Sequence, residues 1–121
     1  MVLIFVTGSM IKSEVAASEV NFMSSAKKHK LWHWYDTSGA RCIHKHEGSW
    51  TDPDPKYYGG FQADISFQRT YGRYFKKNIS YLRRYGTANH WPVILQIHMA
   101  KHGWNARGFA PWPSTRLMCG V

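Results

Sequence analysis

The sequence contains no run of apolar residues that approaches the roughly 20 needed to cross a lipid bilayer. Leucine and alanine are scarce and apolar heptads are absent, which excludes a coiled coil. Apolar residues still make up 44% of the 121 residues and aromatic residues 16%, which is too much hydrophobic surface for a disordered chain. At this length we expect a single domain with one modest hydrophobic core.

Acidic residues are few, since 7 aspartates and glutamates stand against 16 lysines and arginines. The formal net charge is therefore +9. Such a balance favours an anionic partner, and the classes to consider are nucleic acid, a membrane surface and a charged cell-wall polymer.

Cysteine is also rare. Cys42 and Cys119 are the only two, and there is no CxxC pair, which argues against a structural zinc site. The count alone leaves two readings open, one long-range disulfide or two reduced thiols. A disulfide would indicate an oxidising compartment.

Residues 1–30 differ from the rest and are predicted to be an N-terminal tail or a degenerate signal segment. The stretch from Met1 to Val6 is apolar but shorter than the roughly 7–15 residues of a signal-peptide core, and no basic residue precedes it. The small residues Ala16–Ser18 resemble a cleavage site, although charged residues surround them. No clear export signal results. The basic run Lys27–Lys30 fits either a solvated tail or attraction to an anionic polymer.

The compact domain is predicted to span residues 31–121. Its first helix is expected to end at Glu47, because residues 36–38 are good N-cap residues and Gly48 suits the position after a helix C-terminus. Residues 51–60 contain two prolines and a double glycine, so we expect a loop there, with a short β-hairpin as one option.

Two further helices are predicted. Asp64 is expected to cap a short helix that ends at Gly72. A longer helix is expected over about residues 89–102, where apolar residues recur at helical spacing, with Gly103 ending it. The basic and aromatic segment 73–86 lies between the two.

Glu47 is the carboxylate that best fits a catalytic acid. At the C-terminal end of a helix, the negative end of the helix dipole disfavours an ionised carboxylate. The aromatic residues Trp50, Tyr57 and Tyr58 would add an apolar wall with the same effect. A glutamic acid that stays protonated near neutral pH is what a glycosidase needs as its general acid. In isolation, an ordinary surface glutamate explains the same residue.

A series of motifs runs from Glu47 to the end of the chain. Glu47 is followed by Gly48-Ser49-Trp50 and Tyr57-Tyr58-Gly59-Gly60-Phe61-Gln62, and later by Gly103-Trp104, Trp112-Pro113 and Cys119. Over about residues 31–121 this series resembles the transglycosylase-like domain of the resuscitation-promoting factor family, part of the lysozyme-like superfamily. The resemblance implies an α+β, mostly α, small lysozyme-like fold with a short β-hairpin or loop beside the cleft.

The resemblance also implies an activity. A peptidoglycan-cleaving lytic transglycosylase would act on the MurNAc-β-1,4-GlcNAc bond, with Glu47 alone as general acid and then base, and leave a 1,6-anhydro end. No cofactor is expected. The substrate-binding residues that the resemblance implies are Trp50, Tyr57 and Tyr58 for stacking on sugars, Gly60 for close approach of the backbone, and Gln62 for a hydrogen bond.

A disulfide between Cys42 and Cys119 is a further implication of the resemblance. The commonest family members carry the first cysteine next to the glutamate, whereas Cys42 lies five residues before Glu47. A cysteine one turn earlier on the same helix can still face the C-terminal tail. The disulfide would place the protein outside the cytoplasm, secreted and associated with the cell wall. Peptidoglycan glycan strands and anionic wall polymers are the expected partners, nucleic acid is not expected, and a monomer is the default.

Three alternatives stay open. A lysozyme-type hydrolase would need a second carboxylate, for which Asp52 and Asp54 are candidates, since Asp64 is better explained as a helix cap. A non-catalytic cell-wall-binding module would keep the cleft without turnover. A nucleic-acid binder would use the basic segment 73–86, although no nucleic-acid motif accompanies it.

A metal site is not expected. His44 and His46 are two residues apart on a helix and point to different sides. His98 and His102 are four apart and could chelate together, but no third ligand is obvious.

Overall fold

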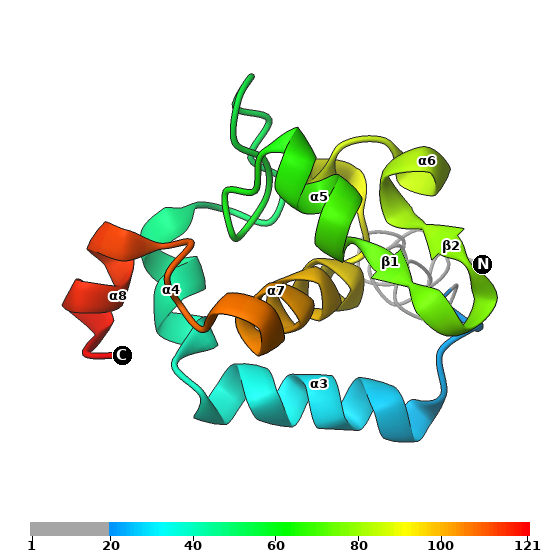
Figure 1. Ribbon diagram of the computed structural model, residues 1–121, viewed down its shortest axis with the longest axis horizontal. Helices are drawn as coiled ribbons and strands as arrows, with labels where there is room; N and C mark the ends of the chain where they lie inside the picture. Colours follow the sequence, from blue (N-terminus) through cyan, green and yellow to red (C-terminus); the bar gives the residue numbers. More distant parts are fainter. Residues whose placement is uncertain (1–19) are drawn as a thin grey trace, which may run out of the picture.

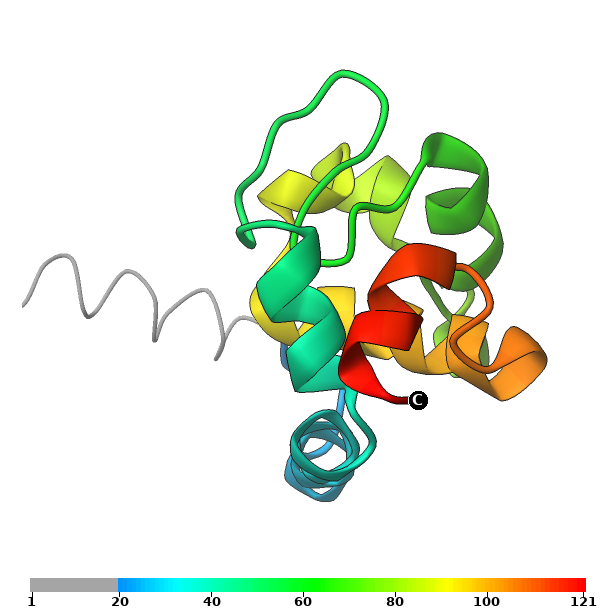
Figure 2. The same ribbon diagram turned by 90° about the vertical axis from the view of Figure 1, so that its left-hand side faces the viewer.

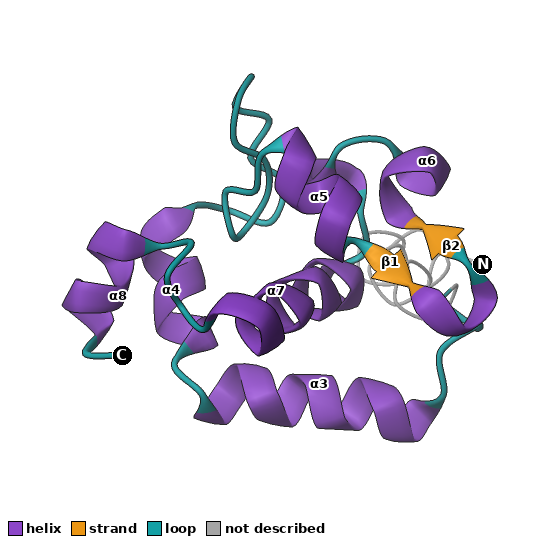
Figure 3. Ribbon diagram, viewed as in Figure 1, coloured by secondary structure: helices purple, strands orange, loops and turns teal. Residues whose placement is uncertain are grey.

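The computed structural model describes residues 20–121, and the predictions for Met1–Val6 and Ala16–Ser18 lie outside these residues (Figure 1). The described part is mostly helical and contains one two-stranded antiparallel sheet (Figure 3), as expected for an α+β, mostly α, protein. Its α-helices are α3 (Ser25–Thr37), α4 (Ala40–Glu47), α5 (Ile65–Tyr71), α6 (Tyr81–Tyr85), α7 (Val93–Arg107) and α8 (Pro113–Cys119). Two short 3-10 helices are η1 (Phe75–Lys77) and η2 (Ala88–His90), and the strands are β1 (Arg73–Tyr74) and β2 (Ile79–Ser80).

Helix α7 forms the centre of the core. It lies between α3 and α5 and packs against both (Figure 1). Seven consecutive residues, 94–100, are buried, so α7 has no solvent-facing side over two turns. A helix covered on all sides in this way is an interior helix, and its polar residues must find partners within the protein.

Helix α3 begins earlier than the sequence predicts. Ser24 caps it by accepting a hydrogen bond from the Lys27 amide, and Leu31, in the middle of α3, is buried. The described end of the predicted tail therefore belongs to the domain, because Val20 and Met23 are also buried in the core. The chain from Lys27 to Lys30 is solvent-facing helix surface rather than tail.

The single helix predicted to end at Glu47 is correct at its end but not at its start. Residues 36–38 end α3 instead of starting a helix, and Gly39 breaks the chain with φ of 101° before α4 begins. A Cβ at Gly39 would lie 2.8 Å from the Val121 side chain, so this turn suits glycine on two counts.

The helix caps at Asp64 and Gly72 are confirmed, since the Asp64 carboxylate accepts from the Phe67 amide and α5 ends at Tyr71. The predicted end of the next helix at Gly103 is wrong. Helix α7 continues to Arg107, and Gly103 is buried inside it. A Cβ on Gly103 would lie 2.3 Å from the Phe67 ring, so glycine serves here as a packing residue.

The β-structure lies elsewhere than predicted. Residues 51–60 form turns with one isolated bridge between Tyr58 and Ala63. The two-stranded sheet instead occupies the basic segment, where Arg73 pairs with Ser80 and Tyr74 with Ile79.

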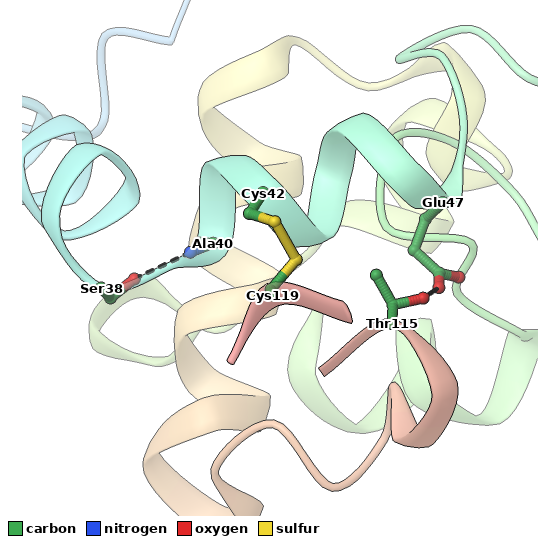
Figure 4. The surroundings of a disulfide bond; sticks show 6 residues. All are labelled: Ser38, Ala40, Cys42, Glu47, Thr115 and Cys119. Atoms are coloured by element: carbon green, nitrogen blue, oxygen red, sulfur yellow. Dashed lines mark hydrogen bonds between the residues drawn. A yellow bond between two sulfur atoms is a disulfide. The ribbon is translucent and has the colours of Figure 1, made fainter. Parts of the chain in front are cut away.

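Helices α4 and α8 lie side by side and are joined covalently (Figure 2). Cys42 on α4 and Cys119 at the end of α8 form a disulfide across 77 residues of sequence (Figure 4). The expected pairing is therefore present. It fixes the C-terminal helix against the helix that ends at Glu47.

Candidate active site

The loop of residues 48–63, which follows α4, is held against the core by a buried glutamine. Gln96 is 1% exposed on α7. Its Oε1 accepts from the Gly60 amide at 2.9 Å, and its Nε2 donates to the Trp50 carbonyl at 2.9 Å and to the Trp91 carbonyl at 3.1 Å. The Gln96 amide thus accepts one hydrogen bond and donates two, all with backbone groups, and two of these groups lie in the loop.

Three more side chains fasten the same loop. His44 donates from Nδ1 to the Gly60 carbonyl at 2.9 Å. Trp112 donates from Nε1 to the Phe61 carbonyl, and Gln68 donates to the Ala63 carbonyl, both at 2.8 Å. Burial lowers the pKa of His44, which keeps the ring neutral in its packed position. The loop is thus preorganised by contacts from three helices and the segment before α8.

Glu47 ends α4 and faces α8. The Thr115 hydroxyl donates to Glu47 Oε2, and Figure 4 shows the two side chains pointing toward each other. Thr115 is 4% exposed, whereas Glu47 is half-buried. Because the disulfide joins the same two helices, it also fixes the backbone that carries this contact.

Glu47 lines a cleft of about 310 Å³ between the end of α4 and the start of α8. A second hollow of about 380 Å³ adjoins it along α5. Both are lined by Tyr57, Gln62, Pro111 and Trp112, so the two form one groove with Glu47 at one end. Within the first hollow Glu47 is the only carboxylate.

The sequence-predicted residues divide into two groups. Glu47, Tyr57 and Gln62 line the groove, and Tyr57 is 41% exposed. Gln62 has φ of 48°, and its Nε2 donates to Asp52 Oδ2 and to the Gly59 carbonyl, both at 3.0 Å. Its Oε1 makes no hydrogen bond within residues 20–121.

Trp50, Tyr58 and Gly60 line neither part of the groove. Trp50 and Tyr58 are half-buried and pack against the core. The Trp50 ring stacks on His44 with 3.7 Å between centroids. Tyr58 donates its hydroxyl to the Pro55 carbonyl at 3.0 Å. Gly60 is buried, and a Cβ there would lie 2.4 Å from the Trp50 ring. The double glycine allows close approach of protein side chains, since a Cβ on Gly59 would lie 2.4 Å from Gln96 Oε1.

The three aspartates have different roles. Asp52 is half-buried and accepts a hydrogen bond from the Gln62 side-chain amide. Asp54 accepts hydrogen bonds from the Lys56 and Tyr57 amides, which lower the pKa of its carboxyl group. Asp64 caps α5. Asp52 lies beside the residue that follows Glu47, since a Cβ on Gly48 would lie 2.9 Å from Asp52 Oδ2.

Within the described residues, Cys42, His46 and Cys119 are the one cluster of three potential metal ligands. The two sulfur atoms are bonded to each other, so they offer no thiolates. His98 and His102 have ring centroids 4.0 Å apart. Their Nδ1 atoms are hydrogen-bonded to the Tyr81 hydroxyl and the Tyr71 carbonyl, respectively. Burial, followed by the charge of His102, lowers the pKa of His98 to about 3.

Thr115 and Gln96 are two site residues that the sequence did not indicate. Thr115 lies 68 residues from Glu47 and Gln96 lies 36 residues from Gly60, and neither belongs to a local motif. The only available signal for Gln96 was a polar residue within the apolar run of residues 93–97.

No family model matches the chain, and no curated protein or solved structure is significantly similar to it. Across residues 20–121, every helix is too short or too polar to cross a membrane.

Proposed function

We propose that the protein is a peptidoglycan-cleaving glycosidase of the lytic transglycosylase type, with a lysozyme-like fold and with Glu47 as its acid and base. The observation that carries this proposal is the position of Glu47. It is the single carboxylate in its part of a groove, it ends a helix, and a buried hydroxyl orients one of its oxygens. The series of motifs from Glu47 to Cys119 supports the same family.

The chemistry requires two proton transfers, one from Glu47 to the leaving oxygen and one from the muramic 6-hydroxyl to Glu47. Glu47 in its acid form gives its proton to the bridging oxygen, and the bond from that oxygen to the muramic C1 breaks as the sugar becomes oxocarbenium-like. The 2-acetamido oxygen stabilises this centre. The Glu47 carboxylate then takes the proton of the muramic 6-hydroxyl, whose oxygen attacks C1, so that a 1,6-anhydro ring closes without water.

Thr115 would leave one Glu47 oxygen for this work. Its hydroxyl donates to Oε2, so Oε1 remains to face the glycosidic bond. Gln62 would contribute an acceptor, because its Nε2 is already bound by Asp52 and Gly59 while its Oε1 has no partner in the described residues. Tyr57 offers an exposed aromatic face for a pyranose ring. Trp50, Tyr58 and Gly60 would act only by holding the loop.

Hydrolysis is the second candidate, and the position of the Asp52 carboxylate favours it. Its carboxylate lies beside Gly48, the residue after Glu47. An inverting or retaining glycosidase needs a second carboxylate within roughly 5–10 Å of the acid. The Gln62 amide donates a hydrogen bond to Asp52, and this contact is compatible with a catalytic carboxylate held in place as well as with a purely structural one.

Turnover tests the proposal directly. Purified peptidoglycan is incubated with the wild type, with Glu47→Gln and with Asp36→Asn, and soluble muropeptides are measured. Asp36→Asn is the matched control, since it makes the same change on an exposed carboxylate of α3 outside the groove. We expect release by the wild type and the control only. Equal release by Glu47→Gln would contradict the role of Glu47 in both candidates. If Glu47→Gln releases nothing, loss of release in Asp52→Asn as well would favour the hydrolase.

A further inference from the structure

The charges of this chain are segregated along the sequence. The segment from residue 65 to residue 121 contains no aspartate or glutamate. Its basic residues are Arg69, Arg73, Lys76, Lys77, Arg83, Arg84, Lys101, Arg107 and Arg116. The carboxylates of the described part all precede it, at positions 36, 47, 52, 54 and 64. The excess positive charge is therefore concentrated in the part of the fold built from α5 onward.

Four of these arginines surround one hollow. Helix α5 lies above α7 in Figure 1, and the two-stranded sheet and helix α6 follow it to the right. They enclose a cleft of about 650 Å³ that is separate from the Glu47 groove. Its lining residues are Arg69, Arg73, Asn78, Ile79, Ser80, Leu82, Arg83 and Arg84. No acidic or aromatic residue is among them. We refer to this hollow as the arginine cleft.

Within residues 20–121, the guanidinium groups of the arginine cleft form no ion pair. Two of them contact aromatic rings: Arg73 lies 5.8 Å from the Phe75 ring centre, and Arg84 lies 5.4 Å from that of Phe22 and 5.9 Å from that of Tyr85. The one ion pair formed by the described residues is between Arg41 and Asp36, far from the arginine cleft in sequence. Arg73 donates from Nη2 to Asn78 Oδ1 at 2.7 Å, and its Nε is buried without a hydrogen bond. The side chains of Arg69 and Arg83 make no hydrogen bond within residues 20–121. Positive charges gathered in this way repel one another, and a bound polyanion would replace this repulsion with attraction.

The chemistry of the lining selects the kind of anion. Arginine binds phosphate through two parallel N–H donors, and several such groups around one hollow suit a chain of phosphates. Nucleic-acid sites that hold single strands add aromatic side chains on which bases stack. None of the lining residues of the arginine cleft is aromatic. Of the rings that contact its arginines from outside the lining, only Phe75 is exposed.

We propose that the arginine cleft binds a phosphodiester polymer without bases, of the poly(glycerol phosphate) kind found among cell-wall polymers. Ser80 and Asn78 at its edge would accept or donate hydrogen bonds to polymer hydroxyl groups. The proposal does not depend on Glu47, and it gives the net charge of +9 a specific place on the molecule.

Binding of purified poly(glycerol phosphate) is measured by calorimetry at low salt for the wild type and for Arg69→Gln/Arg83→Gln. These two arginines are chosen because their side chains are exposed and make no hydrogen bond in the described protein. The matched control is Lys45→Gln/Lys56→Gln, which removes the same charge from exposed residues outside the arginine cleft. We expect at least a tenfold loss of affinity for the arginine variant and less than a threefold loss for the control.

Two further measurements test whether paired arginine donors are needed and which polymer the cleft prefers. Arg69→Lys/Arg83→Lys keeps the charge but loses the paired donors, and we expect its affinity to lie between those of wild type and Arg69→Gln/Arg83→Gln. A single-stranded DNA with the same number of phosphates is expected to bind more weakly than poly(glycerol phosphate). Equal losses of affinity for Arg69→Gln/Arg83→Gln and for the control Lys45→Gln/Lys56→Gln would overturn the proposal, because binding would then follow net charge alone. Tighter binding of DNA through the same arginines would assign the cleft to nucleic acid instead.

Discussion

Replacement of Gln96 by methionine tests how the candidate site is held in place. Methionine has nearly the same volume but neither donates nor accepts in the pattern that Gln96 uses. The variant leaves the Gly60 amide and the Trp50 and Trp91 carbonyls without their partner. Because Gln96 is 1% exposed, water does not reach these groups unless the loop opens.

The magnitude follows from the three hydrogen bonds. Each contributes about 1 kcal/mol net, and a buried group left unsatisfied costs about 1–3 kcal/mol. We therefore expect Gln96→Met to lower the free energy of unfolding by about 3–5 kcal/mol, a large share of the about 5–15 kcal/mol typical of a domain. For a domain of about 100 residues, this corresponds to a fall in Tm of about 12 °C or more.

Urea unfolding followed by tryptophan fluorescence measures this loss, since the chain has 6 tryptophans. Gln68→Met is the graded comparison, because Gln68 holds only the Ala63 carbonyl and the Ala88 amide and should cost less. Hydrogen exchange at the Gly60 amide is expected to be faster in Gln96→Met. A Gln96→Met variant within about 0.5 kcal/mol of the wild type would refute the reasoning.

The remaining predictions concern the disulfide, the hydroxyl beside Glu47 and acid stability. Replacing Cys42 and Cys119 by serine opens a loop spanning a sequence separation of 77, which on the chain-entropy model costs about 4.5 kcal/mol and is measured by thermal unfolding with and without reductant. Thr115→Val removes a hydrogen bond to a carboxylate and should lower kcat about tenfold, whereas Thr115→Ser should restore it. Unfolding free energy should fall as the pH drops from about 6.5 toward 3, by up to about 1.4 kcal/mol per pH unit from His98 alone.

The sign of the acid effect follows from the folded pKa of His98, which burial lowers to about 3. Below the unfolded value of about 6.5, the unfolded chain binds a proton that the folded chain does not bind, so stability is present at neutral pH and lost in acid. A His98→Gln variant should show a shallower dependence over this window. Parallel curves for the two proteins would contradict the assignment, and an unchanged kcat in Thr115→Val would contradict the positioning role of that hydroxyl.

The parts of the fold that sequence predicts well are those determined by neighbouring residues. Asp64 caps α5 because its carboxylate needs only an amide three residues away, and Gly72 ends the same helix. The start of α3 was missed because its buried face, at Leu31 and beyond, follows a run of exposed basic residues that fits a tail equally well. Gly103 stays inside α7 because of a contact with Phe67, which no local pattern reveals.

The candidate site shows the same division. The position of Glu47 at a helix end depends on local signals and was predicted, and Tyr57 and Gln62 lie in the same groove. An aromatic residue serves equally well for packing or for sugar binding, so the sequence could not tell that Trp50 is stacked on a histidine. Thr115 reaches Glu47 only through the docking of α8, which the tertiary fold determines.

The most direct test of the central claim is the mass of the fragments that the protein releases from purified peptidoglycan. The wild type is expected to produce 1,6-anhydro-muramic ends, one water lighter than reducing ends, and Glu47→Gln is expected to produce none. Reducing ends from the wild type would contradict the transglycosylase mechanism and direct attention to Asp52 as a second carboxylate. No release from the folded wild type would contradict the assignment of the groove as a glycosidase site.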